Sequence, residues 1–300
     1  MTNPNGGDRV RLGLVSPRPL PGAYLRHAHS YLDSRVRDLT ATEVPVDGFA
    51  ATTFTGTATG DFAGWNEELV SPATALGIDA ALTWGDLAEH GPALIVTDVD
   101  STFIQDEAIE LLARRANKED EVKAVTDRAM RGELSFEESL TLRVAVLEGL
   151  PSTIIDHVAR EIRPTPGAER LVELAHDRGA RFGLVSGGFT KILDPLAERL
   201  SIDQWIANEL EINDGVLTGR TIGPVIGRET KAEKVTSWAD KYRVPLDRTV
   251  CVGDGANDLD MLGISGLGIA FQAKPIVREQ ADANISFNRL DAVGALFGWA

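Results

Sequence analysis

The stretch from Ala93 to Thr102, which reads ALIVTDVDST, constrains the fold of this chain more than any other segment. Its apolar half is typical of a short strand buried on both faces, as strands at the centre of a parallel sheet are. Asp98 and Asp100 follow directly. Burying a carboxylate is costly unless a cation or a fixed set of donors replaces its lost hydration. Because ligands bind at the carboxyl ends of strands in open α/β sheets, the segment predicts a site there, although a helix cap and a turn would be a purely structural alternative.

Three further segments favour a site over that alternative. An apolar strand, Arg181–Val185, leads into the polar loop Ser186–Thr190. Another apolar strand, Thr249–Val252, leads into the acidic loop Gly253–Asp258, and Lys231 opens a helical pattern between the two. Backbone N–H groups of a Ser-Gly-Gly loop before a helix can form a cradle for an anion. The sequence therefore places an anion-binding loop and an acidic loop directly after predicted apolar strands.

These four segments, in this order, resemble the motifs of the haloacid-dehalogenase-like phosphatases, and their surroundings resemble the phosphoserine phosphatases within that group. The resemblance covers roughly residues 90 to 300. It implies an aspartyl-phosphate intermediate, with Asp98 as nucleophile and Asp100 as general acid and base. It also implies Mg²⁺, held by the side chains of Asp98 and Asp254 and by the backbone carbonyl of Asp100. Asp258 would orient the ligands of the metal ion and the side chain of Lys231.

The same resemblance implies a pocket for a phosphorylated amino acid. Glu107 would contact the amino group of this small-molecule substrate, and Arg143 would hold its carboxylate. Taken alone, both would be interpreted as solvent-exposed charges on helices. Lys231, at the start of a helix, would likewise be interpreted as a surface residue. The remaining substrate contacts that the resemblance implies are Met130, Phe136, Ser186, Gly187, Lys231 and Asn257.

The activity implied is a magnesium-dependent hydrolysis of O-phospho-L-serine to L-serine and phosphate, the last step of serine synthesis. One alternative is a related enzyme that passes the phosphoryl group to homoserine instead of water. Another is a non-catalytic amino-acid sensor with the same fold, against which the intact Asp98, Lys231 and Asp254 argue. Ion-pumping ATPases of the superfamily have threonine where this chain has Asp100, and they keep a longer-lived phosphoenzyme, so the aspartate favours hydrolysis.

The chain divides into segments of different pattern. Residues 106 to 162 carry four helical patterns and no strand, with a capping-box signature at Ser135 and Glu138, and we expect a helical cap there. Residues 90 to 105 and 163 to 300 alternate strands and helices, which predicts a doubly wound parallel α/β core. Residues 1 to 89 contain no lysine and show a βαββαβ order, which predicts a small ferredoxin-like α+β domain. Phosphoserine phosphatases often carry an ACT domain of this topology, so the segment is either an amino-acid sensor or a structural piece that forms a homodimer.

Charge and composition exclude several partners. The 45 acidic and 30 basic side chains give a net charge of −15, which opposes binding to nucleic acid or to an anionic membrane. A phosphate site must therefore carry its own positive charge. The single cysteine, Cys251, cannot form an internal disulfide, no apolar run approaches membrane-spanning length, and no signal-peptide pattern opens the chain. We therefore expect a cytoplasmic protein.

Overall fold

A seven-stranded sheet forms the centre of the molecule in the computed structural model, which describes residues 7–60, 62–130 and 133–300. All neighbouring strands are parallel except the last pair, which is antiparallel. The predicted α/β fold with a parallel sheet is thus confirmed. In spatial order the strands are β11 (Ala283–Ile285), β10 (Leu267–Phe271), β9 (Thr249–Gly253), β5 (Leu94–Thr97), β6 (Arg181–Phe189), β7 (Gln204–Asn213) and β8 (Val216–Ile222).

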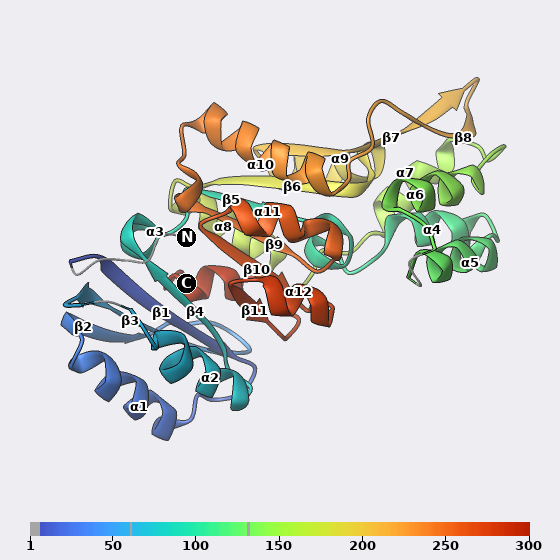
Figure 1. Cartoon of the computed structure of the whole chain (residues 1–300). Coiled ribbons are helices and arrows are strands. Elements are labelled where there is room, and N and C mark those ends of the chain that lie inside the picture. The colour runs from blue at the N-terminus through green and yellow to red at the C-terminus, as the bar shows by residue number, and fades with distance from the viewer. Residues whose placement is uncertain (1–6, 61, 131–132) are drawn as a thin grey trace.

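Helices cover both faces of this sheet (Figure 1). Ile95 on β5 packs in one core cluster with α8 (Ala168–Asp177), α9 (Thr190–Arg199) and α13 (Ala292–Leu296). Leu94 and Val96 point to the other face and pack in a cluster with the helices α10 (Arg228–Tyr242), α11 (Leu259–Ile264) and α12 (Pro275–Gln280). Successive residues of a strand face opposite sides, so a strand enclosed on both sides must be apolar throughout. This explains the continuous apolar run before Asp98.

A group of helices lies at one end of the molecule and is inserted after β5 (Figure 1). The group comprises α4 (Ala108–Arg115), α5 (Glu119–Met130), α6 (Phe136–Ala145) and α7 (Thr153–Glu161). The capping box predicted for α6 is confirmed, with Ser135 Oγ accepting from Glu138 N–H at 3.1 Å and Glu138 Oε2 accepting from Ser135 N–H at 2.8 Å. The chain enters and leaves the group through adjacent segments, since Gln105 N–H donates to the carbonyl of Arg163 at 2.9 Å.

The N-terminal part forms a separate four-stranded antiparallel sheet at the opposite end (Figure 1). Its order, β2-β3-β1-β4, fits the expected βαββαβ arrangement. The apolar positions Tyr24, Ala28 and Leu32 are buried against one face of this sheet. The elements are β1 (Arg9–Ser16), α1 (Gly22–Asp33), β2 (Val36–Glu43), β3 (Ala50–Ala58), a helical turn at Asn66–Val70, α2 (Ser71–Ala75), β4 (Asp79–Trp84) and α3 (Gly85–His90).

The connection between β2 and β3 is longer than the tight hairpin turn that the Asp47-Gly48 pair predicts from the sequence. The two strands end at Glu43 and begin again at Ala50, so six residues connect them. Val44 in this loop is buried in the main core cluster, and the Phe49 ring lies 5.5 Å from that of Phe287. The loop is longer than a hairpin turn because its apolar residues pack on the side of the molecule that holds the larger sheet. The Asp-Gly pair alone does not predict that contact.

The second face of the N-terminal sheet is covered by the C-terminal end of the chain. Gly13 on β1 lies so close to the carbonyl of Leu296 that any Cβ would collide with it. The Arg11 guanidinium donates to the carbonyl of Phe297 at 2.7 Å, and buried Asp79 accepts from both the N–H and the hydroxyl of Ser286, at 2.7 and 2.9 Å. The two sheets therefore share a packed and polar contact. No helix in the described part of the chain has the length and apolar character needed to cross a membrane.

Candidate active site

The carboxyl ends of three parallel strands bring the predicted motifs together. β5 is paired with β6 on one side and β9 on the other, with Thr97 level with Leu184 and Val252. Asp98 and Asp254 directly follow β5 and β9. Ser186 lies within β6, because this strand continues to Phe189 through a bulge and does not end at Val185 as the sequence pattern predicted. The chain runs from β5 toward β6 and β7, and later returns on the other side as β9, so strand order reverses between β5 and β9. Such a reversal opens a crevice in which α/β proteins bind ligands.

A tight backbone turn after β5 positions Asp100. Ser101 has φ 58°, in the left-handed region that non-glycine residues rarely adopt, so the chain reverses directly after Asp100. Asp100 Oδ1 accepts from the N–H of Ala108 at 2.7 Å, and its Oδ2 accepts from the hydroxyl of Ser186 at 2.9 Å. The carboxyl group of Asp100 thus touches both the first residue of α4 and the Ser-Gly-Gly loop.

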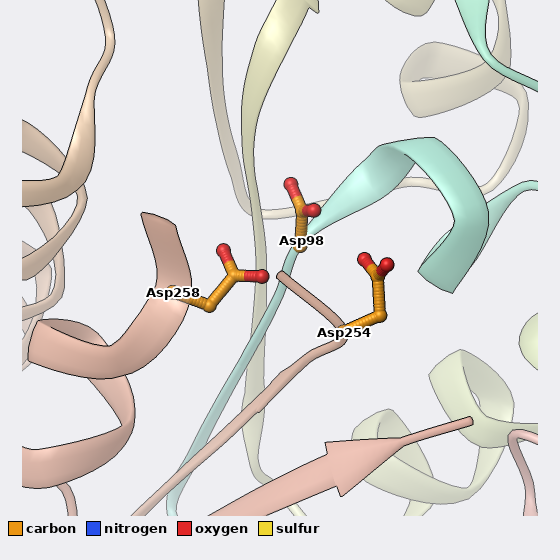
Figure 2. A group of neighbouring side chains, drawn as sticks. All are labelled: Asp98, Asp254 and Asp258. Carbon is orange, nitrogen blue, oxygen red and sulfur yellow. The ribbon is translucent and has the colours of Figure 1, made fainter. Parts of the chain in front are cut away.

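Three carboxylates surround the end of β5 (Figure 2). Asp98, Asp254 and Asp258 each offer an oxygen within 4.8 Å of the other two. Both oxygens of Asp258 are engaged, because Oδ1 accepts from Lys231 and Oδ2 from Gly255 N–H at 2.9 Å. Asp98 Oδ2 and Asp254 Oδ2, by contrast, have no protein partner among the described residues. Asp98 and Asp254 are therefore the better cation ligands, and Asp258 is better suited to orient its neighbours.

Lys231 is fully buried among these carboxylates. Its Nζ donates to Asp98 Oδ1 at 2.6 Å and to Asp258 Oδ1 at 2.7 Å. Burial opposes the charged form, but the carboxylates of Asp258 and Asp98 together raise the pKa of Lys231, so it is an ammonium at neutral pH. Burial, and then Asp258, raise the pKa of Asp254 to about 6. One ammonium cannot neutralise three carboxylates, and the oxygen-only donor set suits a hard divalent cation.

Glu107 and Arg143 lie on the cap side of Asp100. Ser101 Oγ donates to Glu107 Oε1 at 2.8 Å, and burial, followed by the charge of Asp100, raises the pKa of Glu107 to about 7. Burial lowers the pKa of Arg143, while the charges of Glu107 and Asp100 oppose that change, which places the guanidinium in their neighbourhood. The charge of Asp100 thus affects the pKa of both Glu107 and Arg143.

The cap rests on the loops of the core through Phe136. Its ring lies 2.8 Å from where a Cβ of Gly187 would stand and 3.6 Å from that of Gly227. Asn257 lies in the acidic loop, with its side chain against Gly255. The Met130 side chain, which was expected in the pocket, lies outside the described residues.

Several residues of the site carried no recognisable signal in the sequence. Thr102 Oγ1 donates to Asp254 Oδ1 at 3.2 Å and Ser101 holds Glu107, yet both are simply hydroxyl residues after the aspartates. Asn208 on β7 contacts the Ser-Gly-Gly loop from a strand where an asparagine predicts nothing. Asn208 can be connected to the site only if β7 is known to pair with β6. One sequence does not reveal which strands pair.

The fold and this arrangement of side chains define a class of protein. The sequence model of the haloacid dehalogenase-like hydrolases matches residues 95–263, and the chain belongs to that family. Within the family it is similar to phosphoserine phosphatases. It is 52% identical over 221 residues to the phosphoserine phosphatase of Mycobacterium tuberculosis, which covers 74% of this chain and 54% of that protein. It is 50% identical over 230 residues to that of Streptomyces coelicolor, covering 77% of this chain and 56% of that protein.

A solved structure extends the similarity to nearly the whole chain. The unliganded probable phosphoserine phosphatase from Vibrio cholerae superimposes with a TM-score of 0.75 at 34% identity, over 96% of this chain and 86% of that one. The chain nevertheless spans only about half the length of the curated relatives from Mycobacterium and Streptomyces.

Proposed function

We propose that this protein is a magnesium-dependent phosphatase that hydrolyses O-phospho-L-serine to L-serine and inorganic phosphate. One observation carries the proposal: Asp98, held by buried Lys231, stands at the same sheet edge as Asp100, and Asp100 lies beside the charged pair Glu107 and Arg143. A phosphate bound at that edge would place an attached amino acid next to this pair. The names of the similar proteins support the same substrate.

In the first step, a carboxylate oxygen of Asp98 attacks phosphorus. An Asp98–phosphorus bond forms and the bond from phosphorus to the serine oxygen breaks. Asp100 gives its proton to the departing oxygen, so serine leaves as the neutral alcohol. The hydrogen bonds from Ala108 N–H and Ser186 Oγ keep the Asp100 carboxyl group aimed at that oxygen.

In the second step, Asp100, now ionised, takes a proton from a water molecule that attacks the same phosphorus atom. The bond to Asp98 breaks, phosphate leaves, and both aspartates return to their starting states. Lys231 balances negative charge on the transferring oxygens in both steps and prevents Asp98 from repelling the substrate. The closed cap, with Phe136 on Gly187, keeps bulk water away while the phosphate is bound.

The carboxylates of Asp98 and Asp254 and the backbone carbonyl of Asp100 are the groups that would hold Mg²⁺. When bound, the ion brings two anions, the nucleophile and the phosphate, into contact and neutralises charge that develops between them. The unpaired oxygens of Asp98 and Asp254 and the excess of negative charge around Lys231 fit such an ion. We also propose a reducing, cytoplasmic setting, which suits a chain whose single cysteine is buried and free.

Phosphate release from a panel of phosphorylated metabolites tests the proposal. O-phospho-L-serine with Mg²⁺ should be the preferred substrate, and adding homoserine should leave the yield of inorganic phosphate unchanged. Formation of phosphohomoserine instead would identify a phosphotransferase.

The variant Asp98→Asn should bind Mg²⁺ more weakly, form no phosphoenzyme and lose essentially all turnover, while circular dichroism shows a folded protein. Trapping with beryllium fluoride should label wild type only. Retention of even about a tenth of wild-type activity would rule out the covalent route through Asp98, because an asparagine amide cannot form the acyl phosphate that this route requires.

A further inference from the structure

Asn208 is a buried polar residue near the site to which the chemistry above gives no role. It lies on β7 and is 2% exposed. Its Nδ2 donates to the carbonyl of Gly187 at 2.9 Å, and its Oδ1 accepts from the N–H of Ile226 at 2.9 Å. One side chain therefore bridges the Ser-Gly-Gly loop and the segment that leads into α10.

The pairing of β6 with β7 explains why the loop needs such a partner. Val185 is level with Ile206 and Phe189 with Asn208, so three residues of β6 stand opposite the single residue Ala207. This bulge takes the main chain of residues 186 to 188 out of the regular ladder and turns it toward the anion site. It also leaves the partly buried Gly187 carbonyl without a partner in the ladder, and an unpaired carbonyl shielded from water is costly. The Asn208 amide replaces that partner.

The same hydrogen bond fixes the orientation of a peptide plane. The carbonyl of Gly187 and the N–H of Gly188 belong to one planar peptide group. The carbonyl is held by Asn208, and the N–H donates to Ser186 Oγ at 2.7 Å. Since Ser186 Oγ in turn donates to Asp100, rotation of this peptide would disturb both the phosphate loop and the proton carrier.

The other end of the Asn208 amide reaches the lysine helix. Ile226 N–H is its partner, and the next residue, Gly227, accepts from Lys231 N–H at 3.0 Å in the first turn of α10. Asn208 thus links the loop that would receive the phosphate with the helix that supplies the buried ammonium. These two parts of the site come from β6 and from the connection after β8, and no other side chain among the described residues hydrogen-bonds to both segments.

We infer that Asn208 is a positioning residue for phosphate binding, which sets the placement of the Ser186–Gly188 loop relative to Lys231. The inference rests on the proposed function, because it concerns the phosphate half of the same site. The Asn208 side chain bonds Gly187 and Ile226, neither of which belongs to the cap, so its effect should fall on the phosphate group and not on the amino-acid part of the substrate. Substitution of Asn208 should therefore lower activity equally toward any phosphomonoester.

Kinetics of Asn208→Ala and Asn208→Asp, with full-length protein and saturating Mg²⁺, test the inference. Asn208→Ala should lower kcat/KM about tenfold to a hundredfold toward both phosphoserine and p-nitrophenyl phosphate, and should raise the inhibition constant of inorganic phosphate at least about tenfold. Asn208→Asp should do worse, because it still accepts from Ile226 N–H but turns an anionic oxygen toward the Gly187 carbonyl and the phosphate. Asn284→Ala is the matched control, since this strand asparagine also bonds a main-chain carbonyl, that of Arg278, and should leave all constants unchanged.

The result that overturns the inference is a drop in thermal stability and in active fraction with unchanged KM and unchanged phosphate inhibition, because that pattern marks a merely structural residue. A loss confined to phosphoserine would also overturn it. The proposed substrate is judged separately on wild type: hydrolysis of p-nitrophenyl phosphate without hydrolysis of phosphoserine would refute the substrate but leave the Asn208 comparison intact.

Discussion

At the scale of single residues, the site buries several charged side chains. Neighbouring groups of opposite charge partly offset the free-energy cost of burying each of them. Lys231 would be unfavourable in an apolar interior, yet two carboxylates within hydrogen-bonding distance keep it charged. Replacing either partner by a residue that cannot accept a hydrogen bond leaves a buried ion without compensation, whereas Asp98→Asn keeps an acceptor oxygen for Lys231 and should remain folded. Glu107 and Arg143 are less enclosed, and their effects on substrate selection can be measured in folded protein.

Glu107 makes a prediction about pH. Its pKa of about 7 means that the group is neutral below that pH and ionised above it. Only the ionised form attracts the ammonium of phosphoserine, so kcat/KM for phosphoserine should rise as pH increases through about 7. A pH series with p-nitrophenyl phosphate, which has no amino group, should lack this step. Glu107→Gln should be slower at pH 8 and should also lack it, and a step that survives in Glu107→Gln would assign the titration to another group.

Arg143 predicts selectivity for a carboxylate. Losing a hydrogen bond to a charged group costs about 1.5–3 kcal/mol, so Arg143→Ala should lose roughly tenfold to two-hundredfold in kcat/KM toward phosphoserine. The loss toward p-nitrophenyl phosphate should be small. Arg143→Lys should recover only part, since an ammonium cannot form a bidentate pair. Arg114→Ala is the control, because this exposed cap arginine pairs only with Glu119. Equal losses on both substrates would mean that Arg143 holds the cap or the phosphate.

At the scale of elements, the contact of α6 with the β6 loop determines how far the cap can close. A methyl group on Gly187 would stand 2.8 Å from the Phe136 ring, and overpacking of this kind typically costs about 1–3 kcal/mol. Gly187→Ala should therefore lower kcat/KM about tenfold, and Phe136→Leu in the same chain should restore part of the loss. A double-mutant cycle measures this coupling. Gly263→Ala, where a Cβ meets open space, should be neutral. Strictly additive effects would show that the two residues act independently.

The strands and helices of the catalytic part follow closely from the sequence. Apolar runs followed by polar loops predicted β5, β6 and β9, because a strand covered on both faces admits few polar residues. The capping box predicted the start of α6. What one sequence could not provide was tertiary pairing: the bulge between β6 and β7, the bridge made by Asn208, and the burial of Lys231 depend on which elements become neighbours. Residue roles at the site came from resemblance, since a lysine or an arginine on a helix is usually solvent-exposed.

At the scale of the whole molecule, the N-terminal sheet and the catalytic core share a surface. The candidate site residues all lie after residue 89, which indicates that chemistry does not require the N-terminal sheet directly. The core nevertheless presents Leu296 and Phe297 to that sheet, and Ser286 bonds to Asp79 within it. Residues 1 to 89, proposed as a domain from their sequence pattern, thus also pack against Leu296 and Phe297 of the core.

Deleting residues 1 to 89 should therefore lower stability more than activity. Each large apolar side chain newly exposed should cost about 1.5–3 kcal/mol, and Asp79 is lost as the partner of Ser286. Thermal unfolding should show a lower midpoint, whereas turnover of phosphoserine per folded molecule should stay comparable. Asp79→Ala in the full chain isolates one contact and should reproduce part of the loss. An unchanged melting temperature after the deletion would contradict the shared surface.

The close approach of Gly13 to Leu296 has a consequence for the order of events during synthesis. The face of the N-terminal sheet that carries α1 and α2 can close as soon as residues 9 to 84 have left the ribosome. The opposite face must await α13, which at about 5–20 residues per second is made roughly ten to forty seconds later. During that interval the growing chain exposes an apolar sheet surface that only its own last residues cover. Interrupted synthesis should therefore yield fragments prone to aggregate or to bind chaperones, whatever the state of the catalytic half.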